Sequence, residues 1–415
     1  MAVPLDPRQS VHIARQPILD AKKRVYGYEL LYRAQQNDRS CTTSGDLAAA
    51  RVFTDALLAI GLDSLTGGAP AFLNFTRDLL LENVVDLLPM KDVVIELRED
   101  IVVDAEVVEI CKDLKAKGYT IALDDFVADS EAEQLLPFAS FVKLDVHGTA
   151  PIIWQPLAHR LASTSTMVVA ERVETLDIVA QAQDAGCTLF QGYYFCRPAT
   201  QSVKALPARR LAYLNLFSAV NKPDLTIDDL EDLVKRDVSL TMRVLRSINS
   251  AAYGLTQQIT SVRHALVMLG VQQVKKWASV WAMAGLNSGG TPEVVAIALL
   301  RARTCEVVGN IWSGTEAGAE LFLLGMCSML DAIVDQPMEK AISGLALTPA
   351  VREALLGGTG PMRSILDAVI AHEQGDWDQS AQIVDGLSLS STLVPQAYTD
   401  ALRWARDVSA NAEAA

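Results

Sequence analysis

The feature that most constrains this chain is the alternation of short strand-like runs with helical stretches in its first half. Six runs of β-branched and other apolar residues predict strands, over residues 71–75, 93–97, 120–126, 141–146, 167–173 and 189–195. The stretches between them have helical character; residues 104–117, for example, are followed by Gly118, a typical helix end. Repeated alternation of strand and helix predicts βαβ units and therefore a parallel sheet.

The two ends of this pattern set the domain organisation. Residues 11–16 and 25–33 flank a polar turn at 19–23, which predicts a β-hairpin before the first parallel strand. From about residue 206 onward apolar residues recur at helical spacing, as at Val274, Trp277 and Trp281. Two prolines among polar residues at 197–207 indicate a boundary. We therefore expect an α/β domain over residues 1–200 and an all-α domain over residues 201–415.

Composition excludes several classes of protein. With 415 residues, half of them apolar, the chain can bury two or three domain cores and is not disordered. Its net charge of −14 disfavours DNA or RNA as a partner, because binding phosphates draws on clustered lysine and arginine. Six scattered cysteines without a Cys-x-x-Cys pair fit a reducing compartment. Neither a signal peptide nor an apolar run of about 18 residues is present, so we expect a cytoplasmic protein without a membrane partner.

Polar residues stand inside the expected strands or at their carboxyl ends, where parallel barrels and sheets place their active sites. They are Glu29, Asn74, Glu96, Asp124, Asp125, Lys143, Asp145, Glu171, Glu174 and Gln191. From Asn74 to Gln191 the successive spacings are 22, 28, 19, 28 and 20 residues, close to one β/α unit each. Taken singly, an acidic residue at a strand end is most often a cap, a salt bridge or a loop contact. Their joint register predicts that they converge on one face.

Converging carboxylates predict a bound cation. Buried together they repel one another and are costly to desolvate, and a divalent ion relieves both effects. All the donors are oxygens, which favours Mg²⁺, Mn²⁺ or Ca²⁺ over zinc. The adjacent Asp124 and Asp125 suit a pair of ions, an arrangement that recurs in enzymes that cleave phosphodiesters. Lys143 would position an attacking water or screen developing charge.

Seven motifs, in sequence order, resemble those of EAL domains, bacterial phosphodiesterases that linearise cyclic di-GMP to pGpG on a variant TIM barrel. They are Glu29-Leu-Leu-Tyr-Arg33, Asn74-Phe-Thr76, Glu96-Leu-Arg-Glu99, Asp124-Asp-Phe126, Lys143-Leu-Asp145, Ala170-Glu-Arg-Val-Glu174 and Gln191-Gly-Tyr-Tyr-Phe-Cys-Arg-Pro198. The resemblance covers about residues 11–198. It implies an α/β variant TIM barrel of the EAL type that binds cyclic di-GMP with Mg²⁺ or Mn²⁺.

The resemblance also implies a role for each matching residue. The implied ligands of two metal ions are Glu29, Asn74, Glu96, Asp124, Asp125 and Glu171. Asp124 would be shared between the two ions. The other implied roles are handling of the nucleophilic water by Lys143 and Glu171, contact with a substrate phosphate by Arg33, lining of the site by Gln191, and anchoring of the loop after Asp125 by Glu99.

Two departures from the family pattern leave the activity open. The family usually continues Asp-Asp-Phe with Gly-Thr-Gly-Tyr-Ser-Ser, whereas Val127 and Ala128 follow here and disfavour the positive φ that glycine allows. Arg172 replaces a small residue next to Glu171 and adds a cation beside the site. Three hypotheses remain: a phosphodiesterase, a cyclic di-GMP receptor without turnover, and a catalytically inactive adaptor that acts only through protein contacts.

The second half resembles the HDOD domain, a helical relative of HD phosphohydrolases. The matching segments are Arg246-Ser-Ile-Asn-Ser-Ala-Ala-Tyr-Gly254 and Ser261-Val-Arg-His-Ala-Leu-Val-Met-Leu-Gly270. HD enzymes bind metal through an adjacent His-Asp pair, which this sequence lacks; Ser328 and Met329 stand where it is expected. An interaction role with an unidentified signalling protein is therefore favoured. The domain order resembles the EAL-HDOD signalling proteins of the YuxH-like group, and the pairing of EAL barrels implies a homodimer.

Overall fold

The computed structural model describes residues 11–34, 61–82, 84–196, 207–222, 224–235, 241–242, 244–245, 248–249, 259 and 261–413. Contacts divide the chain into two units. The barrel unit comprises Met1–Phe195 together with Ala368–Thr399, and the helical unit comprises Cys196–Asp367 together with Asp400–Ala415. Residues 197–206 of the expected boundary lie outside the described residues. A division at residue 200 stays a prediction, and the packing adds a C-terminal segment to the barrel unit.

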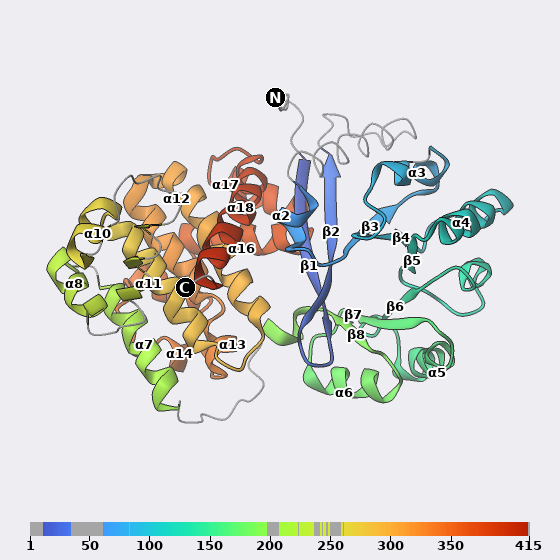
Figure 1. The fold of residues 1–415 in the computed structure, drawn as a ribbon, viewed down its shortest axis with the longest axis horizontal. Coiled ribbons are helices and arrows are strands. Elements are labelled where there is room, and N and C mark those ends of the chain that lie inside the picture. The colour runs from blue at the N-terminus through green and yellow to red at the C-terminus, as the bar shows by residue number, and fades with distance from the viewer. Residues whose placement is uncertain are drawn as a thin grey trace. The chain divides into compact units, whose positions relative to one another are not determined.

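A closed eight-stranded barrel forms the first unit (Figure 1). Strand order follows the sequence; β1 is antiparallel to both β2 and β8, and every other neighbouring pair is parallel. The strands are β1 Val11–Asp20, β2 Val25–Ala34, β3 Ala71–Phe75, β4 Val93–Leu97, β5 Thr120–Leu123, β6 Phe141–Asp145, β7 Met167–Glu171 and β8 Leu189–Gln191. The expected variant TIM barrel and its entrance hairpin are confirmed.

Three strands end two or more residues before their predicted ends, and each ends for the same reason. The expected strands 120–126, 167–173 and 189–195 stop at Leu123, Glu171 and Gln191. Shortly after each end a residue takes positive φ: 41° at Asp125, 54° at Arg172 and 144° at Gly192. Because extended strands require negative φ, the ladder cannot continue past these positions.

Short helices lie between the strands and after β8. They are α2 Leu62–Thr66, α3 Arg77–Leu81, α4 Ala105–Lys117, α5 Pro151–Ala162 and α6 Leu176–Asp184, with 3₁₀ helices η1 Val84–Leu87, η2 Glu131–Leu135 and η3 Tyr193–Cys196. Helix α4 confirms the predicted stretch 104–117. Asp104 caps its first turn by accepting from the backbone N–H groups of Glu106 and Val107, and Gly118 ends it with φ of 97°.

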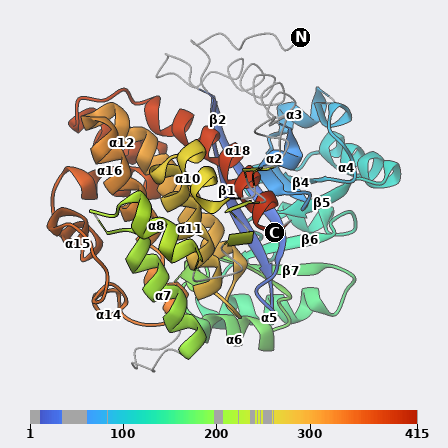
Figure 2. The same ribbon diagram turned by 60° about the vertical axis from the view of Figure 1, so that its left-hand side comes forward.

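The described part of the second half contains helices and no strand, which confirms the all-α prediction (Figure 2). The helices are α7 Ala208–Val220, α8 Ile227–Lys235, α10 Val262–Leu269, α11 Val271–Leu286, α12 Pro292–Cys327, α13 Leu330–Val334, α14 Met338–Ala341, α15 Pro349–Leu355, α16 Pro361–Glu373, α17 Trp377–Gly386 and α18 Leu393–Glu413. Trp277 and Trp281 are buried in the helical core. Of the predicted HDOD motif, most of residues 246–254 lies outside the described part. No described helix is long and apolar enough to cross a membrane.

Within the barrel unit, the C-terminal segment packs on strand β1. His372 of α16 is fully buried and donates from Nε2 to the carbonyl oxygen of Ile13 at 3.1 Å. Its ring centroid lies 4.7 Å from that of Trp377, 4.9 Å from that of Tyr398 and 6.4 Å from that of His12. Burial lowers the pKa of His372 to about 3, and His12 acts in the same direction. The imidazole is therefore neutral in the folded protein at physiological pH.

We expect this histidine to make the barrel unit less stable in mild acid. The unfolded chain protonates His372 below its ordinary pKa of 6.5, whereas the folded chain resists protonation down to about 3. Stability is therefore complete above pH 6.5 and falls as the pH falls, by roughly 2 kcal/mol near pH 5. Urea unfolding of wild type and His372→Gln at about pH 7.5 and 5 would measure it, with exposed His264→Gln as the control. Parallel pH dependence in wild type and His372→Gln would contradict the assignment.

Candidate functional site

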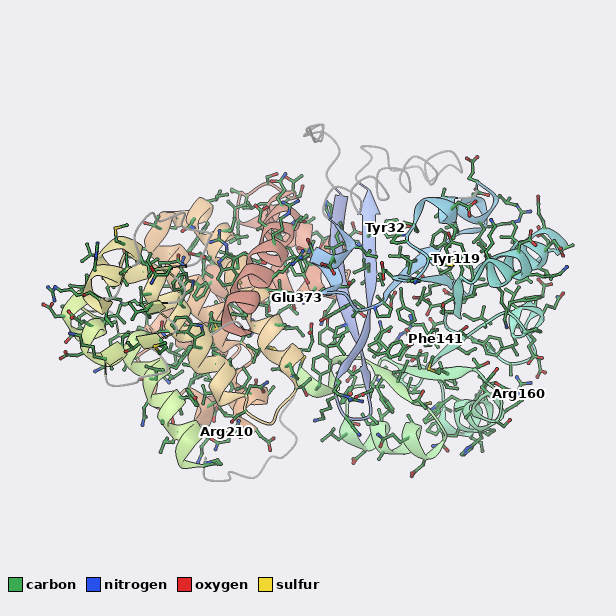
Figure 3. All side chains as sticks on the ribbon, in the orientation of Figure 1. Tyr32, Tyr119, Phe141, Arg160, Arg210 and Glu373 are labelled. Carbon is green, nitrogen blue, oxygen red and sulfur yellow. The ribbon has the colours of Figure 1, made fainter. Side chains whose placement is uncertain are left out.

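The interior of the barrel has an apolar layer and, two residues further along each parallel strand, a polar layer. The apolar layer consists of Ile18, Phe72, Val94, Ala122, Phe141, Val169 and Leu189. Phe141, labelled in Figure 3, packs edge-on against Phe72 with ring centroids 5.2 Å apart. Alternate residues of a strand share a face. The next interior position on each parallel strand is therefore the second residue after its member of the apolar layer. Those positions hold Asn74, Glu96, Asp124, Lys143, Glu171 and Gln191.

Lys143 occupies the centre of this polar layer. Its ammonium lies 3.0 Å from Glu29 Oε2, 3.1 Å from Asp124 Oδ1 and 2.6 Å from Glu171 Oε1, and it also pairs with Glu96 Oε1. The side chain is 0% exposed. One positive charge thus serves four carboxylates that come from different parts of the chain, as the joint register of the motifs predicts.

The electrostatics follow from this shortage of positive charge. Burial raises the pKa of Glu171 to about 8, and neighbouring carboxylates add to the effect while Lys143 opposes it. Burial and the charge of Glu29 likewise hold the pKa of Glu96 well above its usual range. Burial opposes ionisation of Asp124 too, but Lys143 outweighs it and lowers that pKa. Burial alone would lower the pKa of Lys143, yet the surrounding carboxylates raise it. The layer therefore favours uptake of protons or cations.

Glu29 is held by two side-chain amides. Asn74 Nδ2 donates to its Oε1 at 3.1 Å, and Gln191 Nε2 donates to its Oε2 at 2.7 Å. Gln191 Nε2 also contacts Gln16 Oε1 at 3.1 Å. Gln16 is absent from the residues that the motifs predict. The hairpin could have revealed it, because Gln16 pairs with Glu29 in the antiparallel register.

The residues present fit a divalent cation. Glu29, Glu96 and Glu171 each offer a carboxylate oxygen, and these oxygens lie within 4.8 Å of one another. Glu96 Oε2 and Asn74 Oδ1 are buried and accept no hydrogen bond from the described residues. Buried oxygens without a donor are unfavourable, and hard cations such as Mg²⁺ and Mn²⁺ prefer such ligands.

Asp125 lies apart from this cluster and contacts Arg172. Arg172 Nη2 donates to Asp125 Oδ2 at 3.0 Å, and Arg172 Nη1 lies 3.0 Å from Asp145 Oδ2. Burial and the neighbouring charge of Asp124 raise the pKa of Asp125, against the effect of Arg172. The direction of the Arg172 side chain, which the sequence leaves open, is thus toward two aspartates.

The loop after Asp125 is a compact turn. The Phe126 N–H donates to the Lys143 carbonyl oxygen at 3.0 Å, and Ser130 Oγ donates to the Val127 carbonyl oxygen at 2.7 Å. Positive φ falls on Asp129, at 59°, and on neither Val127 nor Ala128. Val127 and Ala128 therefore avoid the positive φ that, as expected from the sequence, they disfavour.

Two predicted site residues are not among these contacts. Glu99 is exposed, and no hydrogen bond or ion pair joins it to the described loop of residues 126–130. Arg33 belongs to β2, where it pairs with His12, and its side chain lies outside the described residues. The loop-anchoring and phosphate-binding roles of these residues stay predictions, as do the roles implied for the clustered residues.

Comparisons with known proteins relate both halves to described families. The EAL domain matches residues 41–198 and the HDOD domain matches residues 206–327. The chain is 31% identical over 406 residues to the uncharacterized protein YuxH of Bacillus subtilis, covering 96% of this chain and 98% of that protein. It is 31% identical over 407 residues to the cyclic di-GMP phosphodiesterase CdgJ of Vibrio cholerae, covering 97% of this chain and 94% of that protein. Among solved structures, a calcium and cyclic di-GMP complex of BlrP1 from Klebsiella pneumoniae matches with a TM-score of 0.37 and 26% identity, over 46% of this chain and 57% of that chain.

Removal of the central ammonium should destabilise the barrel unit. Lys143→Met leaves buried carboxylates without their cation, and we expect the free energy of unfolding to fall by roughly 3–5 kcal/mol. Urea unfolding in the presence of a chelator would measure the loss. Lys112→Met is the matched control, because Lys112 pairs with Glu109 at an exposed position of α4 and should matter little.

A double-mutant cycle separates repulsion from lost packing. If repulsion between carboxylates causes the loss, Glu96→Gln should restore part of the stability of Lys143→Met. Purely additive effects of the two substitutions would argue against the network described above.

Proposed function

Since the chain belongs to the family of proteins that join an EAL domain to an HDOD domain, we propose that its barrel binds cyclic di-GMP and hydrolyses it to pGpG with Mg²⁺ or Mn²⁺. The observation that carries the proposal is the buried Lys143 with four carboxylates around its ammonium inside the barrel. Such a network is costly for stability and is the kind of arrangement found at functional sites. The similarity to a cyclic di-GMP phosphodiesterase over 97% of the chain supports the same substrate.

The acidic site requires a cation to receive this substrate. Cyclic di-GMP is an anion, and the carboxylates around Lys143 exceed the one ammonium that neutralises them. Glu29, Glu96 and Glu171 would hold the ion, with Asn74 and Asp124 beside them. A bound divalent ion polarises a phosphoryl oxygen and makes a water ligand more acidic.

The remaining steps belong to the chain's own side chains. Lys143 and Glu171 are in direct contact, with Nζ 2.6 Å from Oε1. Lys143 would orient the attacking water and Glu171 would accept its proton. Gln191 belongs to the same polar layer, where its side chain donates a hydrogen bond to Glu29. Arg33, which belongs to β2, would contact a phosphate of the substrate.

We assign the helical unit to contact with a signalling protein. The sequence contains no His-Asp pair, and among the described residues the only cluster able to hold a metal lies in the barrel. Metal-dependent hydrolysis by the helical unit therefore has no support. A homodimer, which the family resemblance implies, can be checked by light scattering of the purified protein, and a single-chain mass would contradict it.

One observation favours a second function, that of an adaptor without turnover. Arg172 occupies an oxygen of Asp125, which the family resemblance assigns to metal binding. Calorimetry with cyclic di-GMP distinguishes the hypotheses: an enzyme or a receptor binds the dinucleotide when metal is present, whereas an adaptor that acts only through protein contacts binds none.

The test of the enzyme is turnover by an isosteric variant. We expect the purified protein to form pGpG from cyclic di-GMP with Mn²⁺, and Glu96→Gln to lower the rate by about 100-fold or more, because it removes a charged ligand while keeping the side-chain shape. Chromatography of the products measures both, and a chelator should abolish turnover. Glu109→Gln, on the exposed face of α4, is the matched control. Binding without pGpG would identify a receptor, and equal rates in wild type and Glu96→Gln would reject this site.

A further inference from the structure

We propose that Arg172 takes the place of a second metal ion at Asp125, so that the barrel binds one divalent cation. The proposal rests on the proposed function, because it concerns the same site. Two adjacent aspartates, Asp124 and Asp125, are suited to two ions. The geometry points to one ion within the carboxylate cluster and a guanidinium where the other would bind.

Asp124 and Asp125 face different partners. Asp124 Oδ1 lies 3.1 Å from the buried ammonium of Lys143 inside the barrel. Asp125 has a backbone φ of 41°, and its Oδ2 pairs with Arg172. Neither aspartate belongs to the group of three glutamates whose carboxylate oxygens lie within 4.8 Å of one another. The two neighbouring aspartates are therefore paired with different cations, Asp124 with Lys143 and Asp125 with Arg172.

Two ion pairs hold the Arg172 guanidinium. Its two terminal nitrogens bridge Asp125 and Asp145, each at 3.0 Å. Asp145 is itself held by the backbone N–H groups of His147 and Gly148, both 2.9 Å from its Oδ1. The bridge thus ends on a carboxylate whose own position is set by the main chain, which limits the freedom of the guanidinium to leave.

The backbone of Arg172 adopts an unusual conformation. Its φ of 54° lies in the left-handed region, which a side chain with a Cβ disfavours and glycine adopts freely. A residue held in such a conformation needs compensating contacts, and the two ion pairs supply them. The strained backbone therefore indicates that the Arg172 guanidinium is held beside Asp125 and Asp145, unlike the side chain of a solvated surface arginine.

A guanidinium and a divalent metal ion differ in the chemistry that they supply. A guanidinium neutralises a carboxylate, but it carries no water ligand and cannot activate one as a metal does. The Arg172 side chain is 58% exposed; it donates one hydrogen bond to Asp125 and forms an ion pair with Asp145. A guanidinium has five N–H groups, so others remain for water or an anionic ligand. Arg172 would thus keep the charge of a second cation while removing its ability to activate water.

Asp125 retains one oxygen for a test of this substitution. Its Oδ1 is buried and accepts no hydrogen bond from the described residues. With Arg172 in place, an ion at this oxygen would share the carboxylate with a guanidinium. Without Arg172, both oxygens of Asp125 become available to a divalent ion.

The experiment counts metal ions per chain by titration calorimetry with Mn²⁺ in the absence of nucleotide. We expect one ion for wild type, two for Arg172→Gln, and one again for Arg172→Gln combined with Asp125→Asn. Arg98→Gln is the matched control, because it also removes one positive charge that acts on Asp124, yet Arg98 pairs with exposed Asp100; it should bind one ion. Melting curves establish that each variant is folded.

The outcomes separate this inference from the proposed function. Two ions in wild type, or one in folded Arg172→Gln, overturns the role of Arg172 and leaves the metal-dependent site standing. No bound Mn²⁺ in any variant overturns the proposed function itself. A second readout is the Mn²⁺ electron paramagnetic resonance spectrum, in which neighbouring ions should couple in Arg172→Gln and not in wild type.

Discussion

The structure of the barrel interior depends on one ammonium group surrounded by carboxylates. Lys143 on β6 contacts Glu29 on β2, Glu96 on β4, Glu171 on β7 and Asp124 just after β5. Ion pairs in a buried setting are strong only when their geometry is maintained. The apolar layer one step below keeps the strands in register, because a slip of one residue would turn each interior side chain outward.

The sequence predicts much of this because its information is periodic. Strand positions follow from local apolar runs, and the polar layer follows from strand ends spaced by one β/α unit. The features that the sequence does not predict depend on residues with positive φ and on contacts between residues far apart in the chain. Positive φ occurs at Asp125 and at Arg172; aspartate tolerates this conformation, but its tolerance does not say which aspartate adopts it, and arginine disfavours it. His372 contacts Ile13 across 359 positions of sequence, beyond the range of any local pattern.

The loop after Asp125 shows how a glycine-free sequence can still close this part of the barrel. Positive φ moves to Asp129, a residue type that tolerates the left-handed region better than most. The Phe126 N–H remains hydrogen-bonded to the Lys143 carbonyl oxygen. The loop is therefore tied to the same strand that carries the central ammonium, and a change in its sequence need not displace Lys143.

The packing of the C-terminal segment on β1 has a consequence for synthesis. The barrel unit uses residues from the beginning of the chain and Ala368–Thr399 near its end. A ribosome that adds about 5–20 residues per second exposes β1 long before His372, Trp377 and Tyr398 have been made. The face of β1 around Ile13 is covered only after these residues have been made. The unit whose synthesis begins first is therefore completed only near the end of translation.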